Sequence, residues 1–404
     1  MHLTSEERAM LAGDFGPGVR KAMEIVVALG RIYGAKELVP IASAQVAGVS
    51  YKNLGDAGLQ FLKEWASEGI RVRVPTMLNP AGMDFDNWRE LGIPEGFARK
   101  QMEVMQAFEA MGITPACTCT PYLVSNAPKL GEHIAWSESS AVSFANSVLG
   151  ARTNREGGPS ALAAAITGRT AKYGLHLDEN RQAHYIIDVR CNVKSEADFG
   201  ALGYMVGRQV KDAVPYFKLK GIGGEEEFRE KLRALGAAMA ASGAVALYHV
   251  EGVTPEAQAG KLVAPDAEAL VIESLEEGYA ALNSPAEQID LVSIGCPHAS
   301  LSEIEEVARW LEGKRVKAAL WVTTARRTKE LAEEQGFVEA IEAAGGKVLA
   351  DMCLVVAPIE ELGFHSLATN SAKMAFYAPS YCGLAVRFGS LEQCLEAAMT
   401  GTVH

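Results

Sequence analysis

Long apolar segments and secretion signals are missing from this chain of 404 residues. No run of about 18 or more apolar residues occurs, and a helix needs roughly that length to cross a bilayer. The first residues contain neither the basic stretch nor the apolar core that a signal peptide would need. We therefore expect a cytoplasmic protein without a membrane partner.

Positive charge and paired cysteine motifs are also scarce. Lysine and arginine together number 38, against 50 aspartate and glutamate residues, so the net charge is −12. A protein that binds nucleic acid normally presents a basic face to the phosphates, so we expect no nucleic-acid partner. The seven cysteines form no C-x2-C pair, which argues against a zinc site. In the cytoplasm these thiols are expected to be reduced, buried or bound to metal.

The composition is otherwise that of an ordinary globular protein, with 49% apolar and 22% charged residues. Helical segments alternate with short apolar runs, a pattern typical of an α/β protein. The character of the sequence changes near residues 200 and 285. We therefore expect three α/β domains, at residues 1–200, 201–285 and 286–404.

The same pattern predicts individual elements. Helices are expected at residues 19–33, 56–67, 98–111, 159–167, 225–235, 267–282, 301–311, 325–344 and 391–399. A further helix of small residues should follow the serines near residue 139 and end near Gly150. Strands are expected at residues 70–74, 184–189, 244–250, 290–294, 318–322 and 347–349.

A first polar block lies early in the chain. Gly48, Val49 and Ser50 follow one another, and Asn79 and Pro80 come later. A glycine lets a ligand approach the backbone closely, and a serine hydroxyl can donate a hydrogen bond. These residues are candidates for a substrate-binding wall. An ordinary turn between a strand and a helix, with a capping serine, also explains the block, and the residues alone favour that interpretation while leaving both open.

A second block combines a cysteine, a carboxylate and serines. Cys119 lies in T-C-T-P-Y, and Glu138 and Ser139 lie at an expected helix start. A carboxylate beside capping serines can take part in acid–base chemistry or orient a substrate. The helix dipole alone also favours a glutamate at this position. His176, in the polar run that follows, is more often a structural histidine than a catalyst.

Two cysteines each follow an expected strand. Cys296 comes after residues 290–294 and Cys353 after residues 347–349, while Lys373 lies farther along in T-N-S-A-K. In α/β proteins, ligands bind at the carboxyl ends of strands. A single buried thiol is common and says little. Two thiols at the ends of neighbouring strands can share an iron–sulfur cluster.

These segments resemble the aconitase superfamily. Residues 292–296 followed by Ser300 resemble the segment I-G-S-C-T-N-S. Residues 323–354 resemble the stretch that ends in C-x-x-C, although Ala350 stands at the first position of that pair. An ordinary aconitase would be nearly twice as long and would keep both cysteines. Over essentially its whole length, the chain is similar to the aconitase X branch instead.

The motifs that carry this resemblance are long and specific. They are C-T-C-T-P-Y-L (117–123), A-W-S-E-S-S-A-V (135–142), N-S-V-L-G-A-R-T-N-R-E-G-G-P-S-A-L (146–162), Y-G-L-H-L-D-E-N-R (173–181), G-C-P-H (295–298) and T-N-S-A-K (369–373). One departure is Ser43-Ala44-Gln45, where the branch leads us to expect a histidine before Ala44. The departure weakens any role for that loop.

The resemblance implies an aconitase-like fold, with three α/β domains around a central cleft and no swivelling domain. In aconitases the swivelling domain carries the catalytic serine, so a separate small subunit should close the cleft and supply this serine. The chain is then the large subunit of an iron–sulfur hydro-lyase that acts on a small hydroxy acid. A [4Fe–4S] cluster with one open iron is expected, because such an iron binds the leaving hydroxide as a Lewis acid.

The resemblance also implies roles for single residues. Cys296 and Cys353 are expected cluster ligands, and Cys119 is preferred to Cys382 as the third because its block belongs to the motif set. Lys373 should bind a carboxylate or a phosphate. The second wall of the substrate site is expected to consist of Gly48, Val49, Ser50, Asn79 and Pro80. Glu138 and Ser139 should face the reacting carbon or its hydroxyl, while Cys117, Cys191 and Cys394 should be structural.

Two dehydrations occur in this branch. One converts (R)-5-phosphomevalonate into anhydromevalonate phosphate in an isoprenoid route, the mevalonate pathway, and the other acts on cis-3-hydroxy-L-proline. The large chain is separate from any small subunit, and its motifs follow one another closely. Both features favour phosphomevalonate as the substrate. An inactive homologue that binds a small acid or acts as a scaffold is a further alternative, although Cys296 and Cys353 are present. A zinc hydrolase would need a spaced set of ligands that the sequence does not contain.

Overall fold

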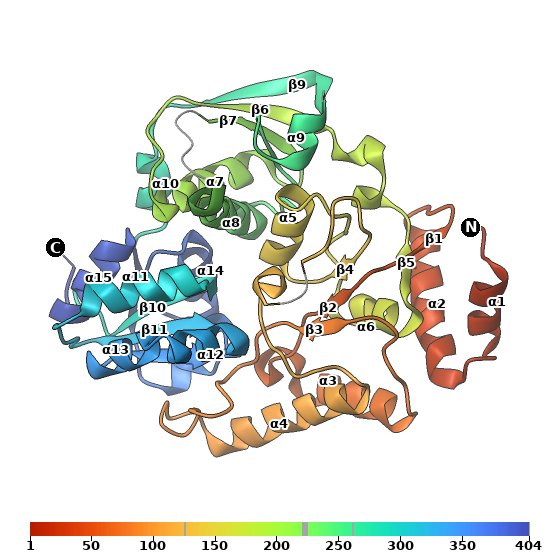
Figure 1. Cartoon of the computed structure of the whole chain (residues 1–404), viewed down its shortest axis with the longest axis horizontal. Coiled ribbons are helices and arrows are strands. Elements are labelled where there is room, and N and C mark those ends of the chain that lie inside the picture. The colour runs from red at the N-terminus through yellow and green to blue at the C-terminus, as the bar shows by residue number, and fades with distance from the viewer. Residues whose placement is uncertain (125–126, 220–224, 261, 404) are drawn as a thin grey trace.

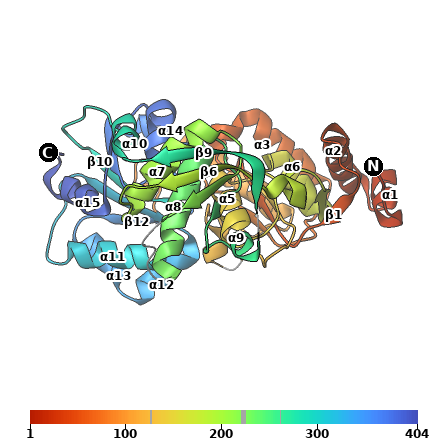
Figure 2. The same ribbon diagram turned by 90° about the horizontal axis from the view of Figure 1, so that it is seen from above.

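The computed structural model describes residues 1–124, 127–219, 225–260 and 262–403, which form three successive α/β regions (Figure 1). Within these residues, the strands of every sheet except one two-stranded pair run parallel. This arrangement confirms the predicted α/β class. The two termini lie at opposite ends of the molecule, as the view from above also shows (Figure 2).

The first region contains a small parallel sheet in the order β3-β2-β4 and the antiparallel pair β1-β5. Its strands are β1 (Leu38–Pro40), β2 (Ala44–Val46), β3 (Thr76–Leu78), β4 (Ala135–Trp136) and β5 (Arg169–Ala171). Its helices are α1 (Ser5–Ala12), α2 (Pro17–Ile32), α3 (Tyr51–Ser67), α4 (Glu95–Ala110), α5 (Ser139–Ser147) and α6 (Gly158–Thr167). Helix α2 packs against α6, and α3 packs against α4.

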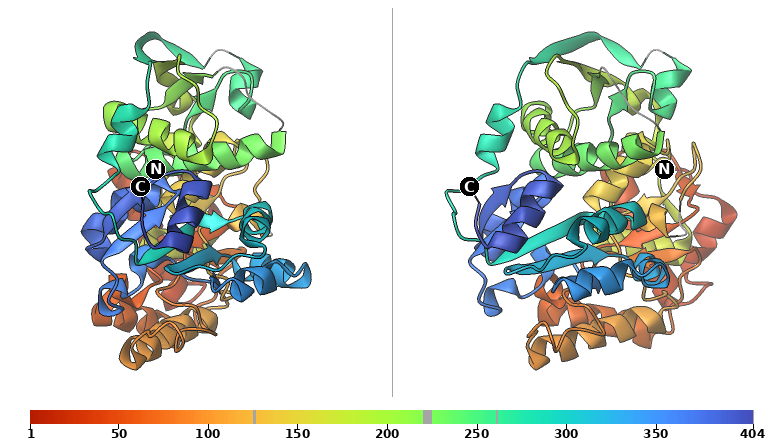
Figure 3. Two further views of the ribbon diagram at one scale, coloured as in Figure 1. Left: turned by 90° about the vertical axis from the view of Figure 1, so that its left-hand side faces the viewer. Right: turned by 60° about the vertical axis from the view of Figure 1, so that its left-hand side comes forward.

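The second region contains a parallel sheet in the order β8-β7-β6-β9. Its elements are β6 (Ala183–Val189), α7 (Glu196–Val210), β7 (Pro215–Lys218), α8 (Glu225–Ser242), β8 (His249–Val250), α9 (Pro255–Ala259), β9 (Val263–Ile272) and α10 (Glu276–Ala281). Helix α8 contacts α5 of the first region and α14 of the third. The second region therefore rests on both others, and its sheet lies at the top of the molecule in Figure 3.

The third region is a five-stranded parallel sheet in the order β12-β11-β10-β13-β14. Its strands are β10 (Leu291–Ala299), β11 (Ala319–Thr324), β12 (Lys347–Ala350), β13 (Ser366–Thr369) and β14 (Ala385–Phe388). Its helices are α11 (Leu301–Leu311), α12 (Arg326–Glu334), α13 (Phe337–Ala343), α14 (Ala372–Cys382) and α15 (Leu391–Thr400). Short 3-10 turns complete the chain, namely Pro121–Leu123, Gly174–His176, Asp178–Arg181, Leu354–Val356 and Ile359–Glu361.

Both faces of the third sheet are buried, which explains the continuous apolar runs in its strands. Successive side chains of a strand point to opposite faces. Val292 and Val322 pack in a core with α11, α13 and α15, whereas Leu291 and Trp321 belong to the core that contains α14. The carboxyl ends of β10 and β12, with the residues that follow them, meet at one edge of this sheet.

Two element predictions are wrong and two are incomplete, one of them the strand expected at residues 244–250, of which only β8 (His249–Val250) forms. Residues 70–74 form no strand; Ile70 packs against α2 at Gly18, and β3 instead supplies the partner of β2. Residues 267–282 have the composition of a helix, but their first part is β9, an edge strand that pairs with β6. Sheet pairing overrides intrinsic helix propensity there. The single helix expected at 325–344 is interrupted at Gly336, whose φ of +77° ends α12 and begins α13.

The strand pairing groups the chain differently near the first expected boundary. A division at residue 200 falls inside α7, and β6 already pairs with β7 and β9 of the second sheet. The pairing therefore favours a division nearer residue 182. The second division, near residue 285, falls between α10 and β10. The domain limits themselves stay predictions. Across the described ranges, no helix combines the length and apolar character needed to cross a membrane.

His176 is buried and forms a histidine pair with His133. The two Nδ1 atoms are 2.9 Å apart, so one ring must keep an unprotonated Nδ1 to accept the bond. Burial, together with the charges of His133, Arg181 and Arg152, lowers the pKa of His176 to about 3. Burial also lowers the pKa of His133. The pair is therefore neutral in the folded chain near neutral pH.

This pair should make stability depend on pH. Below an unfolded-state pKa of about 6.5, the unfolded chain binds a proton on His176 while the folded chain does not, so the free energy of unfolding falls as the pH falls. Between about pH 6 and pH 4, one such proton contributes a slope of about 1.4 kcal/mol per pH unit. In His176→Asn this contribution is absent, and denaturant unfolding at several pH values should give a correspondingly shallower slope. The exposed His184 provides the matched control, His184→Asn, and an unchanged slope in His176→Asn would contradict the prediction.

Candidate active site

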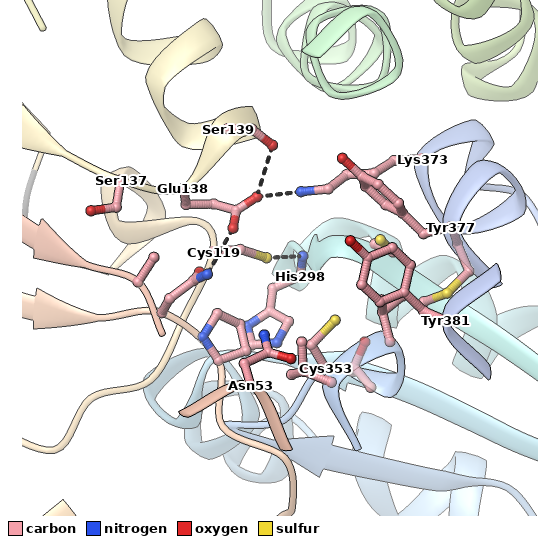
Figure 4. A pocket seen from close by; sticks show the side chains of 18 of the residues that line it. Asn53, Cys119, Ser137, Glu138, Ser139, His298, Cys353, Lys373, Tyr377 and Tyr381 are labelled. Carbon is pink, nitrogen blue, oxygen red and sulfur yellow. Dashed lines mark hydrogen bonds and ion pairs between the residues drawn. The ribbon is translucent and has the colours of Figure 1, made fainter. Parts of the chain in front are cut away.

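A cavity of about 240 Å³ lies where the first and third regions meet. Its lining includes most of the residues that the sequence singled out, as the close view shows (Figure 4). From the first region come Gly48, Asn53, Asn79, Pro80, Cys119, Ser137, Glu138, Ser139 and Arg155. From the third region come Gly295, Cys296, His298, Thr323, Cys353, Lys373, Met374, Tyr377 and Tyr381.

The sheet edge of the third region brings two of the cysteines to this cavity. Cys296 lies in an irregular part of β10, where the preceding Gly295 has a φ of +95°. A Cβ on Gly295 would come within 2.1 Å of the carbonyl oxygen of Thr323, so only glycine lets β10 approach β11 this closely. Cys353 follows β12 after Asp351, a buried residue whose φ is +65°.

His298 links the segments that carry all three thiols. Its backbone N–H donates to Sγ of Cys119 at 3.1 Å. Its Nε2 lies 2.8 Å from the carbonyl oxygen of Met352, which precedes Cys353, and its Nδ1 lies 3.1 Å from Oγ1 of Thr118. His298 itself is two residues from Cys296 and is 1% exposed. This imidazole therefore holds the three segments at a set spacing.

The three thiols share one electrostatic environment. Burial raises the pKa of Cys353 to about 12 and also raises the pKa values of Cys119 and Cys296. The charge of Cys296 raises the pKa of each of the other two further, whereas Lys373 lowers all three. A thiolate on any of them therefore needs additional positive charge nearby, which a bound metal centre would supply.

The donor set fits an iron–sulfur cluster better than a single ion. Within the described ranges, no group of three His, Cys, Asp or Glu side chains is arranged to hold one metal ion. Cluster thiolates each bind a different iron, so they surround a larger volume than the ligands of one ion do. Three unpaired thiols around one cavity have this arrangement, and the amide that donates to Cys119 is a contact that tunes cluster thiolates.

Glu138 is the N-cap of α5 and also lines the cavity, so the helix cap is present and a part in the reaction stays a prediction. Its carboxylate accepts hydrogen bonds from Ser140 and, at 2.8 Å, from Nδ2 of Asn79, and it forms an ion pair with Lys373. Burial alone would raise the pKa of Glu138, but the charge and hydrogen bond of Lys373 and the amide of Asn79 outweigh it. The pKa is lowered to about 2. Glu138 is therefore ionised at neutral pH.

Lys373 lies in the first turn of α14 and is only 11% exposed. Burial would lower its pKa, but the charges of Glu138 and Cys296 outweigh burial and raise it. Ser139 adds a hydroxyl beside the pair, which Figure 4 shows pointing toward Glu138. Asn79 brings a buried Oδ1 with no hydrogen-bond partner among the described residues, an acceptor that a bound hydroxyl group could use.

Gly48 and Pro80 line the cavity, but Val49 and Ser50 do not appear in its lining. Val49 is 1% exposed and packs in the first-region core. Ser50 caps α3 through Lys52 N, and its hydroxyl donates to the carbonyl oxygen of Val356 at 2.7 Å. The side chains of these two residues thus occupy structural positions behind the Gly48 turn.

The other cysteines lie elsewhere. Cys382 is buried at the end of α14, with its Sγ 3.9 Å from the carbonyl oxygens of Leu354 and Val355, and it is not part of the cavity lining. Cys117 and Cys394 are buried, and Cys191 is partly exposed. Of the two alternatives for a third thiol, only Cys119 reaches the cavity.

Several lining residues were not singled out from the sequence. Arg155 and His298 stood inside motifs that carried the resemblance but had no assigned role. Tyr377 and Tyr381 lie four and eight residues after Lys373 on α14, and this helical spacing places all three on one face of the helix. That periodicity was the signal that could have revealed the two tyrosines. Gln45, in the unexpected Ser43-Ala44-Gln45 segment, is fully buried and donates through Nε2 to the carbonyl oxygen of Thr118.

Comparison with known proteins adds three kinds of finding. The models of the first, second and third domains of aconitase X match residues 1–179, 183–279 and 289–400. The phosphomevalonate dehydratase large subunit of Methanocaldococcus jannaschii is 51% identical over 98% of this chain and 100% of its own. The cis-3-hydroxy-L-proline dehydratase of Pseudomonas aeruginosa is 38% identical over 99% of this chain and 70% of its own.

A solved structure is similar over the same extent. The crystal structure titled aconitase X (holo-form), from Thermococcus kodakaraensis, is 50% identical and superposes with a TM-score of 0.91. The superposition covers 98% of this chain and 100% of that chain.

Proposed function

This chain belongs to the aconitase X family, and on that premise we propose that it is the large subunit of a hydro-lyase that converts (R)-5-phosphomevalonate into anhydromevalonate phosphate in the mevalonate pathway. The observation that carries the proposal is the convergence of three thiols and the Glu138–Lys373 pair on one cavity. Expulsion of hydroxide from a β-hydroxy acid needs both an electrophile and fixed charges around the acid.

The relatives favour phosphomevalonate over hydroxyproline as the substrate. The Methanocaldococcus jannaschii relative, which is named a phosphomevalonate dehydratase large subunit, is 51% identical to this chain. The Pseudomonas aeruginosa relative, which is named a cis-3-hydroxy-L-proline dehydratase, is 38% identical. The same phosphomevalonate dehydratase name belongs to the Methanosarcina mazei relative, which is 47% identical over 99% of this chain. A cis-3-hydroxy-L-proline dehydratase remains the second candidate, because that relative also matches nearly the whole chain.

Cys119, Cys296 and Cys353 are the residues that would hold the cluster, which we propose to be [4Fe–4S] with one open iron. Such a cluster supplies a Lewis-acidic iron for the leaving hydroxyl group. The support is the cavity that the three thiols share, the effect of Cys296 on the pKa values of Cys119 and Cys353, and the amide contact to Cys119. The preference for Cys119 over Cys382 is supported by the position of Cys382, which contacts the backbone of the 3-10 turn after Cys353 and is not part of the cavity lining.

The ionised carboxylate of Glu138 suits an orienting role better than that of a base. A general base works best when its pKa lies near the working pH, and a pKa of about 2 is far below it. We therefore assign Glu138 and Ser139 to the substrate's hydroxyl group, which they would hold by hydrogen bonds. Lys373 and Asn79 keep Glu138 in place, and Lys373 also presents its ammonium group to the substrate carboxylate.

A proton must also leave the carbon next to the carboxylate, and the cavity needs another group to take it. We propose that a separate small subunit closes the cavity and supplies a serine for this step. The words "large subunit" in the relatives' names support such a partner. All seven cysteines of the chain are unpaired, which fits a reducing compartment, and the cytoplasm is the location we propose.

A co-expression experiment tests this function. The chain is produced with its candidate small subunit, purified without oxygen and offered each of the two substrates, and loss of water is followed by mass spectrometry. We expect the complex to dehydrate 5-phosphomevalonate and the large chain alone to be inactive. Turnover by the large chain alone would contradict the two-subunit proposal.

The same experiment separates the alternatives. Dehydration of cis-3-hydroxy-L-proline in place of 5-phosphomevalonate would overturn the substrate assignment and leave the cluster proposal intact. A complex that contains iron and sulfide but dehydrates neither acid would instead support an inactive, acid-binding homologue. A brown colour with broad visible absorption is the expected sign of the cluster in every one of these cases.

A further inference from the structure

Arg155 is a cation of the cavity wall that pairs with no other side chain in the described part of the chain. It lines the cavity, and none of the hydrogen bonds or ion pairs among the described residues involves its side chain. Lys373, the other cation of the wall, is already paired with Glu138. An anionic substrate that enters this cavity therefore meets one neutralised cation and one free guanidinium group.

The backbone around Arg155 is fixed although its side chain is exposed. The backbone of Arg155 forms an isolated parallel β-bridge with Trp136 of β4. The amide of Glu156 donates to the carbonyl oxygen of Trp136 at 2.9 Å. The side chain of Asn154 donates to Tyr173. The carboxylate of Glu156 accepts from the hydroxyls of Ser160 and Thr170 and so does not compete for the guanidinium group.

The surroundings of Arg155 also attract negative charge. Its own charge lowers the pKa of Glu138, so the two groups lie within electrostatic reach of each other. Helix α6 begins three residues after Arg155, and its first residue, Gly158, packs so closely on the cavity residue Ala47 that a Cβ would come within 2.4 Å of the Ala47 carbonyl oxygen. The positive end of this helix therefore lies beside the same wall.

The position of Arg155 indicates which end of the substrate it meets. Cys119 is buried and Cys296 and Cys353 are partly buried, whereas Arg155 is exposed, so the reacting carbons of a hydroxy acid must point inward, toward the thiols. In 5-phosphomevalonate the phosphate is at the opposite end of the carbon chain from the carboxylate and the reacting carbons. An exposed guanidinium group on the wall can contact the phosphate at that outer end. Its fork of N–H donors matches the geometry of phosphate oxygens.

We infer that Arg155 binds the phosphate of the substrate and so determines the preference for a phosphorylated hydroxy acid. This inference rests on the proposed dehydration of 5-phosphomevalonate. Arg155 acts here as a specificity-determining residue and takes no part in bond breaking. Its loss should therefore weaken binding far more than it slows the reaction of bound substrate.

The test compares Arg155→Gln, Arg155→Lys and the control Arg190→Gln in the complex with the small subunit, loaded with its cluster. Arg190 is an exposed arginine paired with Asp188 at the end of β6, away from the cavity. For 5-phosphomevalonate, Arg155→Gln should raise KM about 10- to 100-fold with kcat within about threefold, as expected for a lost hydrogen bond to a charged group. Arg155→Lys should fall between wild type and Arg155→Gln, because lysine keeps the charge but not the fork.

Binding of inorganic phosphate gives a second readout that does not depend on turnover. Calorimetry on the same complexes should show phosphate binding at least about tenfold weaker in Arg155→Gln than in wild type or Arg190→Gln. A KM within twofold of wild type, or phosphate binding equal to wild type, would overturn the inference. Should the wild-type complex dehydrate no 5-phosphomevalonate, the proposed function fails, and the phosphate titration alone then supports or overturns the role of Arg155.

Discussion

Glu138→Gln should lower kcat for the dehydration about 10²- to 10³-fold while the chain keeps its cluster. Loss of one fixed charge or donor at a reacting centre has an effect of this size. Glutamine is close to glutamate in shape, so α5 and the amide contact from Asn79 should persist, but the negative charge next to Lys373 is lost. The measurement is steady-state kinetics of the complex with 5-phosphomevalonate, together with its iron content.

The physical reason is the ionisation of Glu138. With a pKa of about 2, its carboxylate is charged across the working pH range, and a charged acceptor binds a substrate hydroxyl more strongly than a neutral amide does. The acid side of the pH–rate profile of wild type should therefore show no ionisation of Glu138 above about pH 3.

The result for Glu138→Gln is compared with that of one control variant. Glu132→Gln is the matched control, because Glu132 is a partly exposed residue of the preceding loop. Its carboxylate accepts from the backbone N–H of Lys129, and its carbonyl oxygen accepts from the backbone N–H of Arg152. It should turn over at the wild-type rate. Full turnover in Glu138→Gln, with normal iron content, would remove Glu138 from the reaction.

The second large effect concerns the choice of the third thiol. Cys119→Ser should lose the cluster during anaerobic purification, whereas Cys382→Ser should retain iron and sulfide at the wild-type level. Loss of a residue that merely supports a metal ligand already costs about 10- to 100-fold in affinity, so loss of a ligand should cost at least about 100-fold. Iron and sulfide analysis with visible absorption provides the measurement, independently of activity.

The geometry explains this contrast. Cys119 lies on the cavity wall with Cys296 and Cys353 and receives the amide hydrogen bond of His298. Cys382 contacts backbone oxygens on the far side of the 3-10 turn at Leu354–Val356. Both cysteines are buried, so the two serine variants change a buried thiol in the same way and serve as controls for each other. A cluster that survives in Cys119→Ser and is lost in Cys382→Ser would reverse the assignment.

The candidate site was readable from the sequence where its chemistry is local. Cys296 lies in the last part of an apolar strand, Cys353 follows another, and Glu138-Ser139 begin a helix, so hydrophobic patterning and motif together located them. Val49 and Ser50 belong to the same local pattern, yet their side chains turn into the core and the helix cap. A turn motif shows that the backbone bends but not which of its side chains will face a cavity.

The residues that were overlooked owe their positions to distant parts of the chain. His298 contacts Thr118 and Met352, which are 180 and 54 residues away in sequence. No sequence pattern near G-C-P-H predicts these partners. Arg155 has no distinctive local setting either. It differs from other arginines because it lines the same cavity as the thiols and because no described side chain pairs with it.

The α/β alternation, the motif chemistry and the family resemblance could all be read from the sequence, because they depend on periodicity and on residues close together along the chain. The edge strand β9 could not, since its pairing with β6 outweighs a helix-forming composition. The ion pair between Glu138 and Lys373 joins residues 235 positions apart, and the low pKa of Glu138 depends on it. Such contacts arise only when separate helices and strands pack together, because burial and charge proximity are properties of the folded chain.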